Sequence, residues 1–178
     1  TIAYNIEDYP SHKNFGDLKR NFYKEDIYVG YRYFETFAKD SVMYPFGFGL
    51  SYSSFQIDFA SAEKGDSIVP VLNCSVKNTG NVAGKEVIQL YVEAPQGKLG
   101  KPARALCAFE KSEILEPGKS QKISFNVNPY TIASYDDSGI TGKKSAYVLE
   151  PGKYNFYLGN DVRSAKLVHS FEVSELIV

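Results

Sequence analysis

From residue 51 onward, apolar side chains alternate with polar ones in short runs, and this period of two most constrains what the chain can fold into. The first run places Phe55, Ile57 and Phe59 on one side, separated by polar residues. Successive side chains of a strand point to opposite faces of its sheet. The run therefore predicts a strand with one face buried.

Further strands are predicted along the rest of the chain, separated by clusters of turn-forming residues. The predicted strands are Phe55–Phe59, Ile68–Val76, Val87–Val92, Arg104–Ser112, Ile123–Val127, Ala146–Leu149, Tyr154–Leu158 and Leu167–Val173. We expect Ala146–Leu149 and Tyr154–Leu158 to form a hairpin around the turn Glu150–Lys153. Seven or eight short strands with such turns predict a mainly β fold, an antiparallel β-sandwich.

The first fifty residues do not share this pattern. Up to about Lys24 the chain has little periodicity and many turn formers, which is typical of an irregular segment packed on another structure. Apolar residues at helical spacing then predict a short helix over Glu25–Thr36. Gly30 in its middle would cost about 1 kcal/mol relative to alanine, which suggests close packing against a neighbour. The glycine-rich aromatic stretch Tyr44–Leu50 is interpreted as a buried extended loop.

Charge and hydropathy argue against several classes of function. The chain has 20 basic and 21 acidic residues and no basic stripe, so a nucleic-acid partner is not expected. No run of 18 apolar residues is present, so no membrane span is expected. The opening residues lack the basic start and apolar core of a signal peptide. Because the chain does not begin with methionine, we interpret it as an excised or processed piece.

Two cysteines, Cys74 and Cys107, lie at apolar-facing positions of predicted strands. There a free thiol behaves as a small hydrophobic side chain, so two buried thiols are favoured over a disulfide. A metal site is disfavoured because neither cysteine has a second ligand nearby in the sequence. Unpaired cysteines favour an intracellular location.

The sequence offers few candidates for a catalytic base. There are only two histidines: His12 lies in a polar loop, and His169 lies in the last predicted strand. A structural role is favoured for both, since no serine or cysteine nucleophile stands in a recognisable motif. Gly47 and Gly49 follow an aromatic loop rather than a strand, which makes a phosphate-binding loop improbable.

Paired carboxylates are the remaining chemistry, because glycoside hydrolysis needs two carboxyl groups across a sugar. Adjacent pairs occur at Glu7-Asp8, Glu25-Asp26 and Asp136-Asp137. Sequence neighbours rarely face one cleft, so capping or solvated roles are favoured. We therefore expect no catalytic residue, no cofactor-binding residue and no metal ligand, and no cofactor.

Several motifs resemble glycoside hydrolase family 3. Tyr23–Phe34 (YKEDIYVGYRYF) and Tyr44–Tyr52 (YPFGFGLSY) resemble the segment that closes the α/β sandwich domain of these enzymes. The fibronectin type III-like domain of the family resembles a second set of motifs, namely Val76–Gly80, Gly84–Val92, Leu106–Lys111, Leu115–Gly118 and Glu150–Tyr154. Ser53-Ser54, where threonine is common, is a small departure.

The resemblance implies two parts: residues 1–50, the end of the α/β sandwich domain, and residues 51–178, a fibronectin type III-like (immunoglobulin-like) sandwich. It also implies a non-catalytic, C-terminal piece of a parent β-glucosidase that hydrolyses terminal β-D-glucosides with retention. The nucleophile and acid/base motifs of the family have no counterpart here.

The expected partners are the catalytic domains of the parent, and formation of a homodimer is a further alternative. Carbohydrate would bind only through the parent, and a cytoplasmic location of bacterial type is expected. The alternative is a stand-alone carbohydrate-binding or adhesion module, which would need an exposed aromatic strip.

Overall fold

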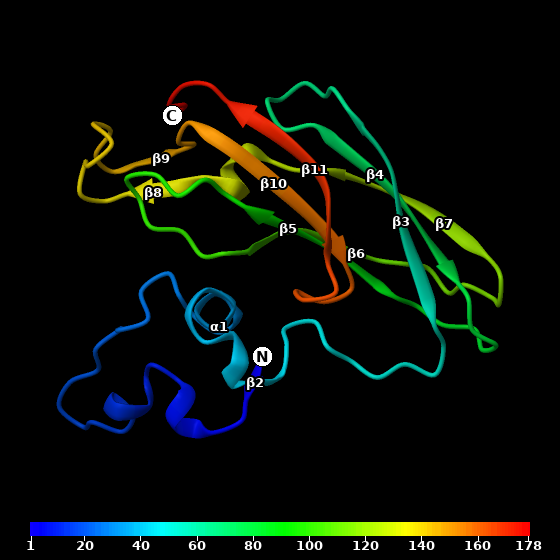
Figure 1. Cartoon of the computed structure of the whole chain (residues 1–178), viewed down its shortest axis with the longest axis horizontal. Coiled ribbons are helices and arrows are strands. Elements are labelled where there is room, and N and C mark those ends of the chain that lie inside the picture. Colours follow the sequence, from blue (N-terminus) through cyan, green and yellow to red (C-terminus); the bar gives the residue numbers. More distant parts are fainter.

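Two antiparallel sheets form a β-sandwich in the computed structural model, which describes all 178 residues (Figure 1). A four-stranded sheet has the order β11-β10-β5-β6, and a three-stranded sheet has the order β3-β4-β7. Their strands are β3 (Phe55–Glu63), β4 (Val71–Asn78), β5 (Val87–Glu93), β6 (Ala105–Lys111), β7 (Ser120–Asn126), β10 (Gly152–Gly159) and β11 (Lys166–Val173). The predicted β-sandwich is confirmed.

The core lies between the two sheets, as the alternation predicts. Leu72, Cys74 and Val76 of β4 are buried, and so are Tyr154 and Phe156 of β10. Stretches of other strands complete one cluster of 17 buried residues. Two details differ from the sequence prediction. Ile68 is exposed and Pro70 precedes β4, whereas Leu167 is exposed because a register shift in the β10–β11 pair changes which residues face inward.

The predicted hairpin of Ala146–Leu149 with Tyr154–Leu158 is wrong. The strand β9 (Ala146–Val148) pairs with β8 (Ser134–Asp136), and β10 pairs with β11 and β5. Alternation indicates a strand but not its neighbour. Here Glu150 is buried against Lys101. Gly152 lies so close to Pro95 that a Cβ placed on Gly152 would be 2.7 Å from the Pro95 Cβ. The chain between β9 and β10 is therefore fixed by the Pro95–Pro102 loop.

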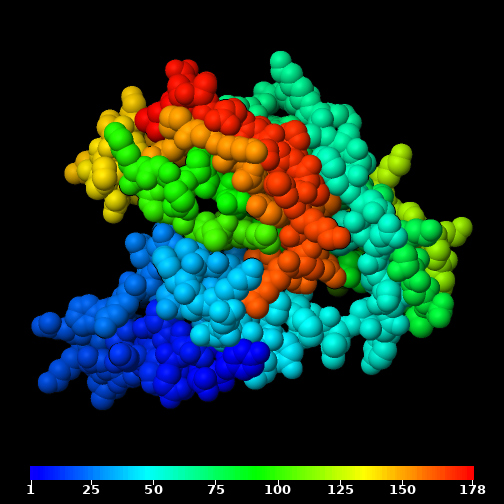
Figure 2. Space-filling model, in the orientation of Figure 1, coloured from blue at the N-terminus to red at the C-terminus, as the bar shows by residue number.

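Residues 1–50 form a small lobe below the sandwich (Figure 2). It contains β1 (Ile2–Ala3), the 3₁₀ turns η1 (Ile6–Asp8), η2 (His12–Asn14) and η3 (Lys39–Ser41), the helix α1 (Tyr31–Phe37) and β2 (Val42–Tyr44). β1 pairs with β2, and Ala3, Phe34 and Val42 form a small core of their own. A fourth 3₁₀ turn, η4 (Pro129–Ile132), precedes β8.

Two expectations for this lobe need correction. The helix begins at Tyr31 rather than Glu25, because Gly30 stands at its N-cap with φ 59° and ψ −127°, a conformation that favours glycine. Gly30 therefore starts the helix instead of sitting inside it. The stretch Tyr44–Leu50 is not a buried loop: Leu50 is 94% exposed, and Tyr44 and Phe48 are also exposed.

No helix of this structure is long and apolar enough to cross a membrane.

Candidate functional site

Strand β5 is buried on both faces, and its second face forms the junction between the lobe and the sandwich. Ile88, Leu90 and Val92 point into the sandwich core, whereas Gln89 and Tyr91 point the other way and are buried as well. Tyr91 packs with Tyr31 and Phe46 of the lobe and with Val162 and Ala165 of the sandwich, and we call these five residues the junction cluster. A half-buried antiparallel strand would show polar residues on its outer face, so this burial requires a covering element.

Aromatic packing and hydrogen bonds hold the lobe on β5. The rings of Tyr31 and Phe46 stack with centroids 4.6 Å apart, and Tyr31 meets Tyr91 edge to face at 6.2 Å. The Tyr31 hydroxyl accepts a hydrogen bond from the Leu106 amide at 2.7 Å, and the Val162 amide donates to the Phe46 carbonyl at 3.0 Å. Burial raises the pKa of Tyr91 well above its usual range.

An ion pair crosses the same junction. Arg163 Nε lies 2.9 Å from Glu35 Oε1, and its Nη2 donates to the Lys39 carbonyl at 2.6 Å. The Glu35 side chain is only 5% exposed, so this carboxylate depends on Arg163 for its neutralisation. The Thr36 hydroxyl also accepts from the Ala103 amide at 2.9 Å. Charge and packing thus fix one orientation of the lobe.

Gly47 packs closely against the sandwich across the junction. It has φ +90°, and a Cβ placed there would lie 2.7 Å from the Cα of Asp161 and 2.7 Å from Nε2 of Gln89. Gly49, two residues on, has no neighbouring atom within 4 Å of such a Cβ. Close packing against the sandwich therefore favours glycine at position 47, whereas no such contact restricts position 49.

The lobe and the two residues that follow it, Ser51 and Tyr52, carry an exposed apolar surface. Most of the large apolar side chains that are exposed in this structure lie in the first 52 residues, which make up less than a third of the chain. We call this surface the docking face. Its most exposed members are Phe15, Leu18, Tyr23, Leu50 and Tyr52, each at least 88% exposed. Isolated exposed apolar residues are ordinary, but such a concentration marks an interaction surface.

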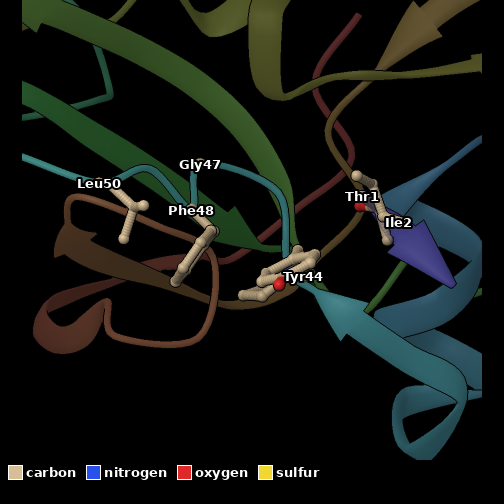
Figure 3. A pocket seen from close by; sticks show the side chains of 7 residues that line it. Thr1, Ile2, Tyr44, Gly47, Phe48 and Leu50 are labelled. Carbon is tan, nitrogen blue, oxygen red and sulfur yellow. The ribbon is translucent and has the colours of Figure 1, made fainter. Parts of the chain in front are cut away.

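An open groove of about 430 Å³ lies within the docking face. Figure 3 shows Tyr44 between the Thr1–Ile2 side and Phe48, with Leu50 beyond. The rings of Tyr44 and Phe48 are 4.8 Å apart. The Thr1 hydroxyl is buried without a hydrogen-bond partner. Such burial costs free energy unless another group forms a hydrogen bond with the hydroxyl. Most of the residues that line the groove are apolar.

The structure separates the sequence candidates for chemistry. His12 lies in η2 and His169 in β11, on different parts of the fold. Asp8 accepts a hydrogen bond from the Asn5 amide at 3.0 Å, which is a capping role. The pair Glu25-Asp26 lies in a turn before α1. No group of three or more His, Cys, Asp or Glu side chains that could hold a metal ion is present.

Asp136 is also a structural carboxylate. Burial alone would raise its pKa, but hydrogen bonds from the Thr141 hydroxyl and from the amides of Thr141, Gly139 and Ile140 lower that pKa to about 2. These donors close the loop after β8. The predicted capping role is confirmed for Asp136, whereas its neighbour Asp137 is exposed and faces a cavity described below.

The sequence did not predict the buried ion pair between Lys101 and Glu150. Lys101 Nζ contacts Glu150 Oε2, and both side chains are at most 5% exposed. Burial opposes ionisation of Glu150, but the Lys101 ammonium and the amides of Lys98 and Leu99 lower its pKa overall. Forty-nine residues separate the partners, so only the fold brings them together. The pair fixes the Pro95–Pro102 loop.

Both cysteines are free, as predicted, but only Cys74 is fully buried, whereas Cys107 is partly exposed. Burial raises the pKa of the Cys74 thiol to about 11 and that of the Cys107 thiol to about 12. The Cys107 Sγ lies 3.2 Å from the Leu90 carbonyl, within a β5–β6 contact. Neither thiol has the lowered pKa of a nucleophile.

These features define a class: a β-sandwich domain that carries a docked lobe and has a wide exposed apolar face. Comparison with known proteins agrees. The sequence model of the fibronectin type III-like domain matches residues 86–162. A β-glucosidase from Ruminococcus albus is 55% identical over 171 residues, which cover 96% of this chain and 18% of that protein.

Solved structures give the same answer. The β-glucosidase from Paenibacillus barengoltzii superposes with a TM-score of 0.94 at 51% identity, covering 99% of this chain and 20% of that one. A glycoside hydrolase family 3 β-glucosidase from Bifidobacterium adolescentis gives a TM-score of 0.86 at 31% identity, covering 97% and 25%. The chain belongs to glycoside hydrolase family 3, of which it is a fibronectin type III-like, non-catalytic part. It spans about a fifth of the length of these relatives.

Proposed function

We propose that this chain completes and stabilises a retaining β-glucosidase by packing its docking face against the catalytic domains of the parent enzyme. Relatives named β-glucosidase support the activity, and the exposed apolar surface of the first 52 residues carries the proposal. The parent would hydrolyse terminal β-D-glucosides, and this chain would contribute no catalytic residue.

The division into two parts supports this role. Residues 1–50 belong, in this proposal, to the end of the α/β sandwich domain, and residues 51–178 form the fibronectin type III-like domain. The lobe has its own small core at Phe34 and is tied to β5 by the junction cluster. It would therefore act as a rigid connector between the sandwich and the rest of the enzyme. We also propose a cytoplasmic location, in keeping with two free cysteines.

A first experiment tests where catalysis resides. The isolated chain is incubated with an aryl β-D-glucoside beside the intact parent at equal molar concentration. We expect turnover by the parent and none by the isolated chain. Turnover by the isolated chain that survives further purification would overturn the assignment of catalysis to other domains.

A second experiment tests the docking face itself. Leu50→Asp is introduced into the parent, with Ile114→Asp as the control because Ile114 is also exposed, at 64%, but lies outside the face. A carboxylate forced into an apolar interface lacks compensation, so Leu50→Asp should destabilise the parent by on the order of 3 kcal/mol or more. Ile114→Asp should have little effect. Equal melting temperatures of the two variants would contradict the proposal.

A further inference from the structure

Three tyrosines gather at the β8–β9 end of the sandwich, away from the groove of the docking face. Tyr135 and Tyr147 are cross-strand partners in the β8–β9 pair, with ring centroids 5.0 Å apart. Tyr130 of η4 adds a third ring, 4.2 Å from Tyr147. Each of the three is between 42% and 57% exposed, so their rings form a surface that we call the tyrosine platform.

The platform borders a cavity of about 520 Å³ between the lobe and the sandwich. Tyr135 and Tyr147 form one wall, and Ile27 and Tyr28 of the lobe lie in the lining as well. Small-molecule sites typically have volumes of about 300–1,000 Å³ and occur preferentially where two structural units meet. In Figure 2 this end of the sandwich, in yellow and green, overhangs the blue lobe.

The polar groups in the lining are few and free. The side chains of Asp26, Arg32 and Asp137 line the cavity, and none of them makes a hydrogen bond or an ion pair within the chain. Lys101 also lines it, but its ammonium is held by Glu150. Two carboxylates and one guanidinium give no positive excess, so the cavity is a poor site for a phosphate or another anion.

Flat aromatic rings beside free carboxylate and guanidinium groups suit a neutral ligand that has apolar faces and hydroxyl edges. A pyranose ring has this chemistry: its C–H face stacks on an aromatic ring, and its vicinal hydroxyls donate to carboxylates and accept from guanidinium groups. We propose that the tyrosine platform and its cavity form a non-catalytic binding site for a neutral oligosaccharide of pyranose rings. The site does not depend on the activity proposed for the parent.

The test is a titration of the 178-residue chain with cellotetraose, laminaritetraose and maltotetraose, followed by NMR. We expect saturable chemical-shift changes at Tyr135 and Tyr147 with at least one of these sugars. The Kd should be on the order of 1 mM, because an open site contacts only part of the sugar. Inorganic phosphate at the same concentration should not displace the sugar. Absence of saturable binding for all three sugars would overturn the proposal, as would displacement by phosphate.

Variants locate the site. The double variant Tyr135→Ala/Tyr147→Ala should weaken binding at least about tenfold, since both stacking surfaces are lost. Tyr52→Ala is the matched control, because Tyr52 is 98% exposed but does not line the cavity, and this variant should bind normally. Tyr135→Phe/Tyr147→Phe keeps both rings and should retain most of the affinity.

If the alanine variant fails to fold, the map of shifted resonances in the unaltered chain still decides the location. Shifts that cluster elsewhere would overturn the proposal. The same titration on the intact parent provides a last check. If the sugar that binds the isolated chain no longer binds at these tyrosines in the parent, another domain covers the platform and the site does not exist in the enzyme.

Discussion

Replacement of Gly47 by alanine should loosen the lobe from the sandwich. Gly47 has φ +90°, in the left-handed region where a side chain costs about 1–2 kcal/mol. The added Cβ would also lie 2.7 Å from the Asp161 Cα and 2.9 Å from the Asn160 carbonyl oxygen. Because these are backbone atoms, relief requires movement of the β10–β11 turn, and overpacking of this kind costs about 1–3 kcal/mol. The expected total is about 2–5 kcal/mol.

Hydrogen exchange measures this loss where it occurs. The Val162 amide donates to the Phe46 carbonyl and the Leu106 amide to the Tyr31 hydroxyl, so both report on docking of the lobe. Their protection should fall by a factor of at least about 30 in Gly47→Ala, since 1.4 kcal/mol corresponds to tenfold. Amides in the β4–β7 pair, inside the sandwich, should keep theirs.

Gly49→Ala is the matched control because a Cβ at Gly49 meets no atom within 4 Å and its φ is not in the left-handed region. This variant should exchange like the unaltered chain or slightly more slowly. Equal protection in Gly47→Ala and Gly49→Ala would refute the reasoning, because steric fit at Gly47 would then have no energetic weight.

Three further predictions concern the buried polar groups. Lys101→Met should lower the free energy of unfolding by about 3–5 kcal/mol in denaturant titrations, because Glu150 would be left buried and unpaired. The double variant Lys101→Met/Glu150→Leu should recover much of the lost stability. Asp136 has a folded-state pKa of about 2, below its unfolded value of about 4. Its stabilisation of the loop after β8 is therefore full above pH 4 and is lost as the pH falls toward 2. Proteolysis of that loop by pepsin should accelerate over this range, and in Asp136→Asn it should be fast throughout. The thiols of Cys74 and Cys107 should resist an aromatic disulfide reagent at neutral pH and react only after unfolding, whereas rapid reaction in the folded state would contradict the burial of Cys74 and the raised pKa of both thiols.

The sequence predicts the sandwich well because strands such as β3, β4 and β7 bury one face, and that burial gives their sequences a period of two. It predicts less where the outcome depends on which elements meet. The burial of Tyr91 follows from the docking of α1 on β5, which no local pattern indicates. Gly30 reads as a defect inside a helix until its positive φ shows that it begins the helix.

The tyrosine platform and the buried ion pair are each formed by residues that only the fold brings together. Tyr130, Tyr135 and Tyr147 come from η4, β8 and β9, and the incorrectly predicted hairpin hid their proximity. The pair Lys101–Glu150 joins two loops in the same way. The sequence itself shows only three tyrosines within eighteen residues, and this does not distinguish a platform from scattered surface residues.

In the proposed role, the docking face is buried against the rest of the parent enzyme. Hydroxyl-radical footprinting of the isolated chain and of the intact parent tests it most directly, because it reports the accessibility of individual side chains. Phe15, Leu18, Tyr23, Leu50 and Tyr52 should be modified readily in the isolated chain and protected in the parent, while Val82 and Ile114 should be modified equally in both. Equal modification of the docking face in the two samples would contradict the account.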